Sequence, residues 1–299
     1  MRDEQKTWTV LEMIEWSTQY LEGKGVEDSR LNIERLLAHV LHYDRVKLYI
    51  NFDRPLKQDE LQEFKSLLLR RAKREPLQYI LGETEFYSLS LNVRPGVLIP
   101  RPETEILIET AIDSIEDKTA ELSILDIGCG SGAITVALAV HFNNATIQAV
   151  DISKSAIETS RENAMRHKVD NRIHFHRSDF LEWGNEAIFE SGFDLIVSNP
   201  PYISFEEKNT LEPEVKEFEP ADALFAEEPL QFYKAIADFA QANLSQSGRV
   251  ICEISPNLEK SVSAIFQQAG LCEVSTVIDL ADKPRIVTGK RPAQEMRHA

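Results

Sequence analysis

The chain has 299 residues, of which 42% are hydrophobic and 27% charged, and its formal net charge is −16. This composition is typical of a globular protein with one large domain or two ordinary ones. The acidic balance argues against tight, nonspecific binding of free nucleic acid, which needs a basic surface. It suits a basic protein partner, although charge kept only for solubility explains it at least as well.

The sequence also indicates in which cellular compartment the protein is expected. No apolar run is long enough to span a bilayer, and no apolar segment of a signal peptide follows the first six residues. The three cysteines (Cys129, Cys252 and Cys272) have no paired spacing, which predicts neither a disulfide nor a zinc site. We therefore expect a cytoplasmic protein with no membrane partner and no bound metal.

The first 75 residues predict a small helical domain, because their apolar residues recur at helical spacing. Asp28 or Ser29 is expected to cap the second helix, and a third helix should run from about Asp59 and stop before Pro76. A small module of this kind is usually a recognition or placement device, though it can be purely structural. We assign residues 1–75 to substrate recognition.

Residues 76–100 predict a β-hairpin that links two domains. Apolar residues before and after the segment Asn92–Gly96 indicate two strands, with the turn in that segment. The prolines of Pro100–Glu105 could start the next helix. Arg101 and Glu103 either line the entrance of a site or form a charge pair at that helix start, and both readings stay open.

From Leu122 onward, predicted strands and helices alternate, which implies a doubly wound α/β fold over residues 101–299. Its sheet should be mostly parallel and seven-stranded, with the last two strands forming a C-terminal hairpin. The predicted strands are 123–127, 146–150, 172–176, 193–197, 249–254, 272–278 and 285–287. The predicted helices are 133–142, 156–167, 230–244 and 258–269, the second of them capped by Ser153 or Ser155.

A glycine-rich turn follows the first predicted strand. Glycines let the backbone turn sharply and approach a ligand without a Cβ in the way. Its residues, the first part of the predicted cofactor site, are Gly128, Cys129, Gly130, Ser131 and Gly132. Two positions before the first glycine stands Asp126, and no His or Lys neighbours Cys129, which is therefore expected to be a loop residue and not a nucleophile.

Three further residues complete the predicted cofactor site. Asp151 ends the second strand, nineteen residues after the last glycine, where its carboxylate can accept both hydroxyls of a ribose. Asp179 follows the third strand and can receive an adenine amino group, with Phe180 packed against the ring. Together these residues predict a pocket for an adenosine-containing ligand.

The spacing discriminates between such ligands. A dinucleotide site needs Gly-x-Gly-x-x-Gly, whereas this turn reads Gly-x-Gly-x-Gly, and no Gly-x-x-x-x-Gly-Lys-Ser/Thr is present to bind a triphosphate. S-adenosylmethionine fits better, because it carries no phosphate and its ammonium and sulfonium suit an acidic pocket.

The fourth predicted strand ends at a stiff turn, Asn199-Pro200-Pro201-Tyr202. The prolines have no N–H and keep Asn199 out of the helical region, so the strand stops there. The Asn199 side-chain carbonyl and the Pro200 main-chain carbonyl are both acceptors and can hold the two hydrogens of a substrate NH2 group. Tyr202 offers a flat face for a planar amide or base. Asn199 is counted among both the catalytic and the cofactor-contacting residues, and all four residues are expected to bind substrate.

The glycine turn, Asp151, Asp179 and the Asn199 turn resemble class I S-adenosylmethionine-dependent methyltransferases, whose fold is Rossmann-like. Within that class, three further stretches resemble the HemK/PrmC family of protein-(glutamine-N5) methyltransferases. They are Leu77-Gln78-Tyr79-Ile80-Leu81-Gly82-x-x-Glu85-Phe86-Tyr87, Val97 to Glu105, and Glu219-Pro220-x-x-Ala223-Leu224. The resemblance covers nearly the whole chain.

The resemblance implies transfer of a methyl group from S-adenosylmethionine to the side-chain amide nitrogen of the glutamine in the Gly-Gly-Gln motif of peptide-chain release factors, the proteins of translation termination. Asn199, Pro200 and Tyr202 would be catalytic. The chain departs from the family pattern at Ser88, where glycine is usual, at residues 225–229, and at Ser255. These departures touch neither the Asn199 turn nor the glycine loop.

Two other functions compete with this interpretation. A nucleic-acid amino methyltransferase could use the same turn on a flipped base, but the charge of −16 and the lack of a basic stripe oppose it. A non-catalytic sensor of an adenosine ligand is opposed by the presence of every element that transfer needs.

Overall fold

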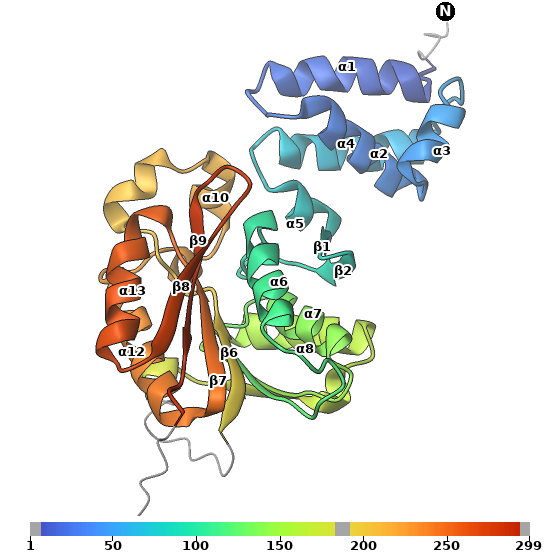
Figure 1. The fold of residues 1–299 in the computed structure, drawn as a ribbon. Helices are drawn as coiled ribbons and strands as arrows, with labels where there is room; N and C mark the ends of the chain where they lie inside the picture. Colours follow the sequence, from blue (N-terminus) through green and yellow to red (C-terminus); the bar gives the residue numbers. More distant parts are fainter. Residues whose placement is uncertain (1–6, 183–191, 294–299) are drawn as a thin grey trace, which may run out of the picture. The chain divides into compact units, whose positions relative to one another are not determined.

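The computed structural model describes residues 7–182 and 192–293 (Figure 1). The chain divides into two compact units. One is formed by Met1–Gly82 together with Glu212–Phe218, and the other by Glu83–Leu211 together with Glu219–Ala299. A short stretch of chain from the second half of the sequence therefore belongs to the N-terminal unit.

The N-terminal unit is helical in its described residues, as predicted. Its helices are α1 (Val10–Glu22), α2 (Ser29–Leu41), α3 (Arg45–Ile50), α4 (Gln58–Arg71), α5 (Leu77–Leu81) and α10 (Pro213–Phe218). They enclose a core of their own, with Ile14, Leu37 and Phe64 among its buried residues. Asp28 stands at the N-cap of α2 but makes no side-chain capping bond, and Ser29 instead donates to the Val26 carbonyl at 2.7 Å.

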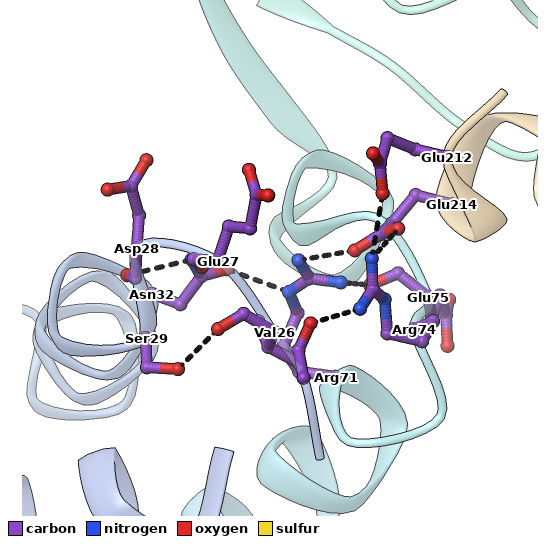
Figure 2. Close-up of polar contacts among 11 residues, drawn as sticks. Val26, Glu27, Asp28, Ser29, Asn32, Arg71, Arg74, Glu75, Glu212 and Glu214 are labelled. Atoms are coloured by element: carbon purple, nitrogen blue, oxygen red, sulfur yellow. Dashed lines mark hydrogen bonds and ion pairs between the residues drawn. The ribbon is translucent and has the colours of Figure 1, made fainter. Parts of the chain in front are cut away.

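Helix α10 is held to this unit by two arginines of the segment that ends α4 (Figure 2). Glu214 accepts from Arg71 at 2.9 Å and from Arg74 at 2.6 Å, and Glu212 accepts from Arg74 at 3.2 Å. Arg71 is itself buried and also donates to Asn32 of α2 at 2.7 Å. The arginines thus join α2, α4 and α10 through one polar cluster.

The second unit contains a seven-stranded sheet in its described residues, with strand order β5-β4-β3-β6-β7-β9-β8 (Figure 1). Strands β3 to β7 are parallel to one another, whereas β9 runs antiparallel to both β7 and β8. This confirms the predicted α/β class, the mostly parallel sheet and the C-terminal hairpin. The strands are β3 (Ser123–Ile127), β4 (Thr146–Asp151), β5 (Ile173–Arg177), β6 (Phe193–Ser198), β7 (Leu244–Glu253), β8 (Cys272–Ile278) and β9 (Pro284–Lys290).

Helices cover both faces of this sheet (Figure 1). On one face lie α6 (Glu105–Asp113), α7 (Ala133–His141) and α8 (Lys154–Arg166), and on the other α12 (Pro229–Asn243) and α13 (Glu259–Gln268). Each face of the sheet packs into a hydrophobic core of its own, and successive strand residues point alternately into the two. Leu195 and Val197 of β6 lie in one core and Ile196 in the other. Strands buried on both faces read as continuous apolar runs, which is why the sequence signal was clear. Ser153 caps α8, as predicted, by accepting from the Ala156 N–H at 3.3 Å.

The hairpin lies elsewhere than predicted. Its strands are β1 (Glu83–Phe86) and β2 (Leu89–Asn92), joined at Tyr87 and Ser88, and the segment Val97–Ile99 is not a strand. The prediction that the hairpin turns at 92–96 was therefore wrong, although a turn does lie there, closed by the Val97 N–H that donates to the Arg94 carbonyl at 3.1 Å. Tyr87 and Ser88 have φ of 48° and 60°, the left-handed conformation of a two-residue hairpin turn. That conformation is usually signalled by Gly, Asn or Asp, and neither residue gives the signal.

The chain after β6 contains short elements that the sequence patterns did not predict. They are η3 (Phe205–Thr210), α10 and α11 (Ala221–Leu224), while η1 (Pro102–Thr104), η2 (Asp170–Arg172) and η4 (Pro256–Leu258) precede α6, β5 and α13. Helices this short carry too few residues for a periodic apolar pattern. None of the helices in the described ranges has the length and apolar character needed to cross a membrane.

Candidate active site

A cavity of about 540 Å³ opens at the carboxyl ends of β3, β4 and β6 in the second unit. Open α/β sheets bind their ligands at this edge. The predicted site residues that line the cavity are Gly128, Gly130, Asp151, Asp179, Phe180, Asn199, Pro200 and Pro201. The lining does not include Cys129, Ser131, Gly132 or Tyr202.

The glycine loop is shaped by backbone bonds and by close packing. The N–H groups of Gly128 and Cys129 both donate to the Val150 carbonyl, which fixes the loop against β4. Gly132 begins α7 with a φ of 82°, and a Cβ there would lie 2.3 Å from the Ser160 hydroxyl, so this position requires glycine. Burial raises the pKa of the Cys129 thiol well above its ordinary value, in keeping with a loop residue that is not a nucleophile.

Asp126 lies beneath this loop and is fully buried. Its Oδ2 accepts from the Thr135 hydroxyl, while its Oδ1 has no hydrogen-bond partner in the described part of the chain. Burial raises the pKa of Asp126 to about 7, and the nearby Asp151 acts in the same direction. A cationic ligand in the cavity would favour the ionised form of this carboxyl.

Asp151 faces the cavity from the end of β4. Its Oδ2 accepts from the Gly130 N–H at 2.9 Å and its Oδ1 from the Ser153 N–H at 2.8 Å. Burial raises the pKa of Asp151, and these two backbone bonds partly oppose the rise. Each carboxylate oxygen keeps a second lone pair, so the fixed carboxylate can accept further bonds from ligand hydroxyls.

Asp179 and Phe180 follow β5 in the sequence and line the cavity. The Asp179 Oδ1 accepts from the Leu181 N–H at 2.9 Å. The Phe180 ring is buried and meets Phe239 of α12 edge-on, with 5.5 Å between ring centroids. The ring is therefore held rigidly at the cavity wall, where it offers apolar surface to a flat ligand.

Asn199 stands at the first residue after β6. Its Nδ2 donates to the Thr104 hydroxyl at 3.2 Å. Among the described residues, neither the Asn199 Oδ1 nor the Pro200 carbonyl accepts a hydrogen bond. Neither acceptor is used by another described residue, and both residues line the cavity.

Tyr202 is tied to the end of β7 and does not line the cavity. Its hydroxyl donates to Glu253 Oε1 at 3.2 Å, and burial together with the Glu253 carboxylate raises its pKa far above the ordinary value. The hydroxyl thus stays protonated. Arg101, which the sequence left undecided, pairs with Glu219 at 2.6 Å, and Glu103 lies 3.8 Å from Arg285.

Comparisons with known proteins bear on both units. Residues 12–82 match a family model described as the PrmC N-terminal domain, and residues 118–270 match one described as a methyltransferase domain. A release factor glutamine methyltransferase of Geobacter sulfurreducens is 41% identical over 97% of this chain and 99% of its own. Another, of Chlorobaculum tepidum, is 39% identical over 83% of this chain and 86% of its own.

The chain belongs to the release factor glutamine methyltransferase family. This confirms the predicted family and, with the methyltransferase model, the predicted class I fold. Among solved structures, the T. thermophilus 16S rRNA N2 G1207 methyltransferase in complex with AdoMet and guanosine aligns with a TM-score of 0.50 and 16% identity. The alignment covers 70% of this chain and 49% of that one, and at this identity it shows the fold alone.

The donor expected of this family fits the cavity. At Gly128 and Gly130, the side on which a Cβ would project is open for 4 Å, so a ligand can approach the backbone closely. The carboxylates of Asp151 and Asp179 line the cavity, with Asp126 buried two residues before the glycine loop, and this acidic character suits a cation without phosphate. These observations fit S-adenosylmethionine.

Two residues of this family member's site were missed by the sequence reasoning. Thr104 was noted only as part of a motif, and Glu253 only as part of a strand, yet both contact residues of the Asn199 turn. The sequence did contain a signal for Glu253, which is a carboxylate at the end of the apolar residues of β7. Burying a carboxylate is costly unless it is hydrogen-bonded, so a glutamate in that place indicates specific partners.

Proposed function

We propose that this protein transfers the methyl group of S-adenosylmethionine to the side-chain amide nitrogen of a glutamine, namely that of the Gly-Gly-Gln motif of peptide-chain release factors. The family supports the reaction and the class of protein substrate. The observation that carries the proposal is the pair of unoccupied acceptors, Asn199 Oδ1 and the Pro200 carbonyl, at the wall of the cavity.

A primary amide has two N–H bonds, and these acceptors would take both. An amide nitrogen is a poor nucleophile because its lone pair is delocalised into the carbonyl. Holding both hydrogens orients the nitrogen and stabilises the charge that develops on it, so positioning and fixed dipoles replace a strong base. When bound, the donor would supply an electrophilic methyl group on a sulfonium. The new N–C bond would form as the S–C bond breaks, its electron pair would stay on the sulfur as a neutral thioether, and the amide would lose one proton to water. Pro201 and Tyr202 would shape the substrate side of the turn.

The remaining site residues would hold the donor. Gly128, Cys129, Gly130, Ser131 and Gly132 would surround its methionine part through the loop backbone. Asp151 would accept the ribose hydroxyls, and Asp179 and Phe180 would bind the adenine. The helical residues 1–75 would hold the release factor, residues 76–100 would link them to the catalytic domain 101–299, and the protein would act in the cytoplasm.

The test is transfer of labelled methyl from S-adenosylmethionine to a purified, unmethylated release factor, with the modified residue located by mass spectrometry. We expect label on the Gly-Gly-Gln glutamine and none in a substrate that carries Gln→Ala. Asn199→Ala should abolish transfer while leaving donor affinity nearly unchanged. Near wild-type transfer by Asn199→Ala would reject the proposed role, and label on DNA or RNA alone would favour a nucleic-acid enzyme.

A further inference from the structure

Glu253 is the last residue of β7 and is only 2% exposed. Its Oε2 accepts from the Thr104 hydroxyl at 2.6 Å, and its Oε1 accepts from the Tyr202 hydroxyl at 3.2 Å. Thr104 in turn accepts from Asn199 Nδ2 at 3.2 Å. A buried carboxylate is thus connected to the Asn199 turn by two side chains.

The direction of these bonds follows from counting protons. Both Glu253 oxygens accept in this structure, one from Thr104 and one from Tyr202, so the single hydroxyl hydrogen of Thr104 is used on Glu253. The Thr104 oxygen can then only accept from Asn199. The Asn199 side chain must therefore present its NH2 group to Thr104, which leaves its Oδ1 on the opposite side.

We propose that Glu253, acting through Thr104, is the positioning residue that turns the Asn199 carbonyl oxygen toward the substrate amide. This inference rests on the proposed function, because a substrate NH2 group with two hydrogens, such as that of the glutamine amide, needs an acceptor at that point. Without the carboxylate, Thr104 could donate to Asn199 instead, and the Asn199 amide would rotate by half a turn to offer its NH2 group.

Within residues 7–182 and 192–293, no cationic side chain forms an ion pair with Glu253, which is held by other contacts. Its backbone carbonyl accepts from the Tyr233 hydroxyl at 2.9 Å, and its strand position pairs with Ile286 of β9. Arg285 bonds to Asp279 at 2.8 Å, so its guanidinium serves another carboxylate. A buried carboxylate bonded only by hydroxyl groups is an expensive feature for stability alone.

The first experiment compares Thr104→Val, Thr104→Ser and Glu253→Gln by kcat on an unmethylated release factor. Thr104→Val removes the hydroxyl at nearly constant volume, and we expect its kcat to fall at least about tenfold, the worth of one hydrogen bond. Glu253→Gln should fall similarly, whereas Thr104→Ser keeps the hydroxyl and should stay near wild type. S-adenosylmethionine affinity should change less than about twofold in all three.

The double variant Thr104→Val with Glu253→Gln tests whether both residues act through one path. If they do, its kcat should be no lower than that of the worse single variant, because residues of one network are not additive. Losses that multiply would mean that the two residues act independently and would overturn the inference.

The second experiment reads the orientation of Asn199 directly. A release factor with Gln→Glu presents acceptor oxygens where the glutamine presents hydrogens, so wild-type protein should bind it more weakly. In Glu253→Gln the ratio of affinities for the Gln and Glu substrates should fall by about tenfold, because a rotated Asn199 donates to the carboxylate. General damage to the site would weaken both substrates without changing the ratio.

An unchanged ratio, or wild-type kcat in Thr104→Val, overturns the positioning role even if the wild-type enzyme methylates glutamine. If wild-type protein methylates no release factor, the proposed function itself fails. If Glu253→Gln does not fold, the ratio of affinities for the Gln and Glu substrates is measured with Thr104→Val instead. That variant also removes the hydroxyl that accepts from the Asn199 amide, so it tests the same positioning role.

Discussion

Glu214 of α10 and Glu253 of β7 are both poorly exposed carboxylates, but their partners differ. Glu214 accepts from two guanidinium groups, those of Arg71 and Arg74 (Figure 2). Burial alone would raise the pKa of Glu214, but the bonds from the two arginines and a backbone N–H outweigh it and lower the pKa. In the part of the chain that the structure describes, the Glu253 carboxylate accepts from two hydroxyl groups and from no cation, and burial dominates and raises its pKa.

The difference shows two uses of a buried carboxylate. Opposite charges at Glu214 neutralise one another, so its bonds fasten α10 to the N-terminal helices. At Glu253 no described residue supplies a cation, so burying the carboxylate is costly, but the carboxylate fixes which way its neighbours donate. Changes at Glu214 should therefore affect stability, and changes at Glu253 should affect transfer.

The largest stability effect is expected from Glu214→Gln. The substitution leaves the buried Arg71 without its anionic partner, which should lower the free energy of unfolding of the N-terminal unit by about 2 kcal/mol. Hydrogen exchange followed by mass spectrometry on peptides of α4 and α10 should show the loss. Glu212→Gln is the matched control, because Glu212 is exposed and bonds only Arg74, so its effect should stay below about 0.5 kcal/mol. Equal losses in the two variants would contradict the assignment.

Asp126, buried next to the glycine loop of the proposed donor site, extends the comparison, because no cationic side chain among the described residues pairs with it. With a pKa of about 7, it is mostly protonated at pH 6 and mostly ionised at pH 8. A cationic donor favours the ionised form, so its affinity should rise about tenfold over this range. Calorimetric titration of wild type and Asp126→Asn would measure this. The ligand and Asp151 titrate in both proteins, so any difference between them comes from Asp126. If donor affinity depended on pH equally in both, Asp126 would not be the group responsible.

The two glutamates should also give pH dependences of opposite sign. The lowered pKa of Glu214 means that the stability it contributes is present above the unfolded glutamate pKa of about 4.3 and is lost as pH falls through the folded value. The raised pKa of Glu253 means that the folded state binds more protons, so its contribution falls as pH rises from about 4.3 through the folded value.

Chemical denaturation from pH 3.5 to 7 would test the signs. Relative to wild type, Glu214→Gln should become less stable with rising pH and Glu253→Gln more stable. Glu103 and Arg285 lie near Glu253 with opposite effects on its pKa, and both are present in each protein compared. The same sign for both variants would break the contrast between the two carboxylates.

Much of the second unit could be predicted from sequence, because its signals are local. Strand β3 matched its predicted bounds, and buried parallel strands such as β6 read as apolar runs ended by the Asn199 turn. The bonds from Thr104 and Tyr202 to Glu253 could not be predicted, because they join residues 149 and 51 positions apart. Such contacts depend on which strands become neighbours, and no local pattern carries that information.

The placement of residues 212–218 in the N-terminal unit was also outside the reach of local patterns. Its cause is the pairing of Glu214 with Arg71, 143 positions away. The hairpin was missed for a different reason. Its turn residues, Tyr87 and Ser88, adopt the left-handed conformation without being glycine or asparagine, so the usual turn signal is missing.

The smallest change in stability is expected at this hairpin turn, which contacts neither Glu214 nor Glu253. A non-glycine residue in the left-handed region costs about 1–2 kcal/mol, and glycine recovers this cost while losing about 0.5–1 kcal/mol in chain entropy. We therefore expect Ser88→Gly, at a φ of 60°, to stabilise the second unit by about 0.5 kcal/mol. Ser88→Ala is the control, since it removes the hydroxyl but keeps the Cβ and should give no gain. Thermal unfolding of the three proteins would show whether the strain at Ser88 is real, because a gain in Ser88→Ala as well would assign the effect to the hydroxyl.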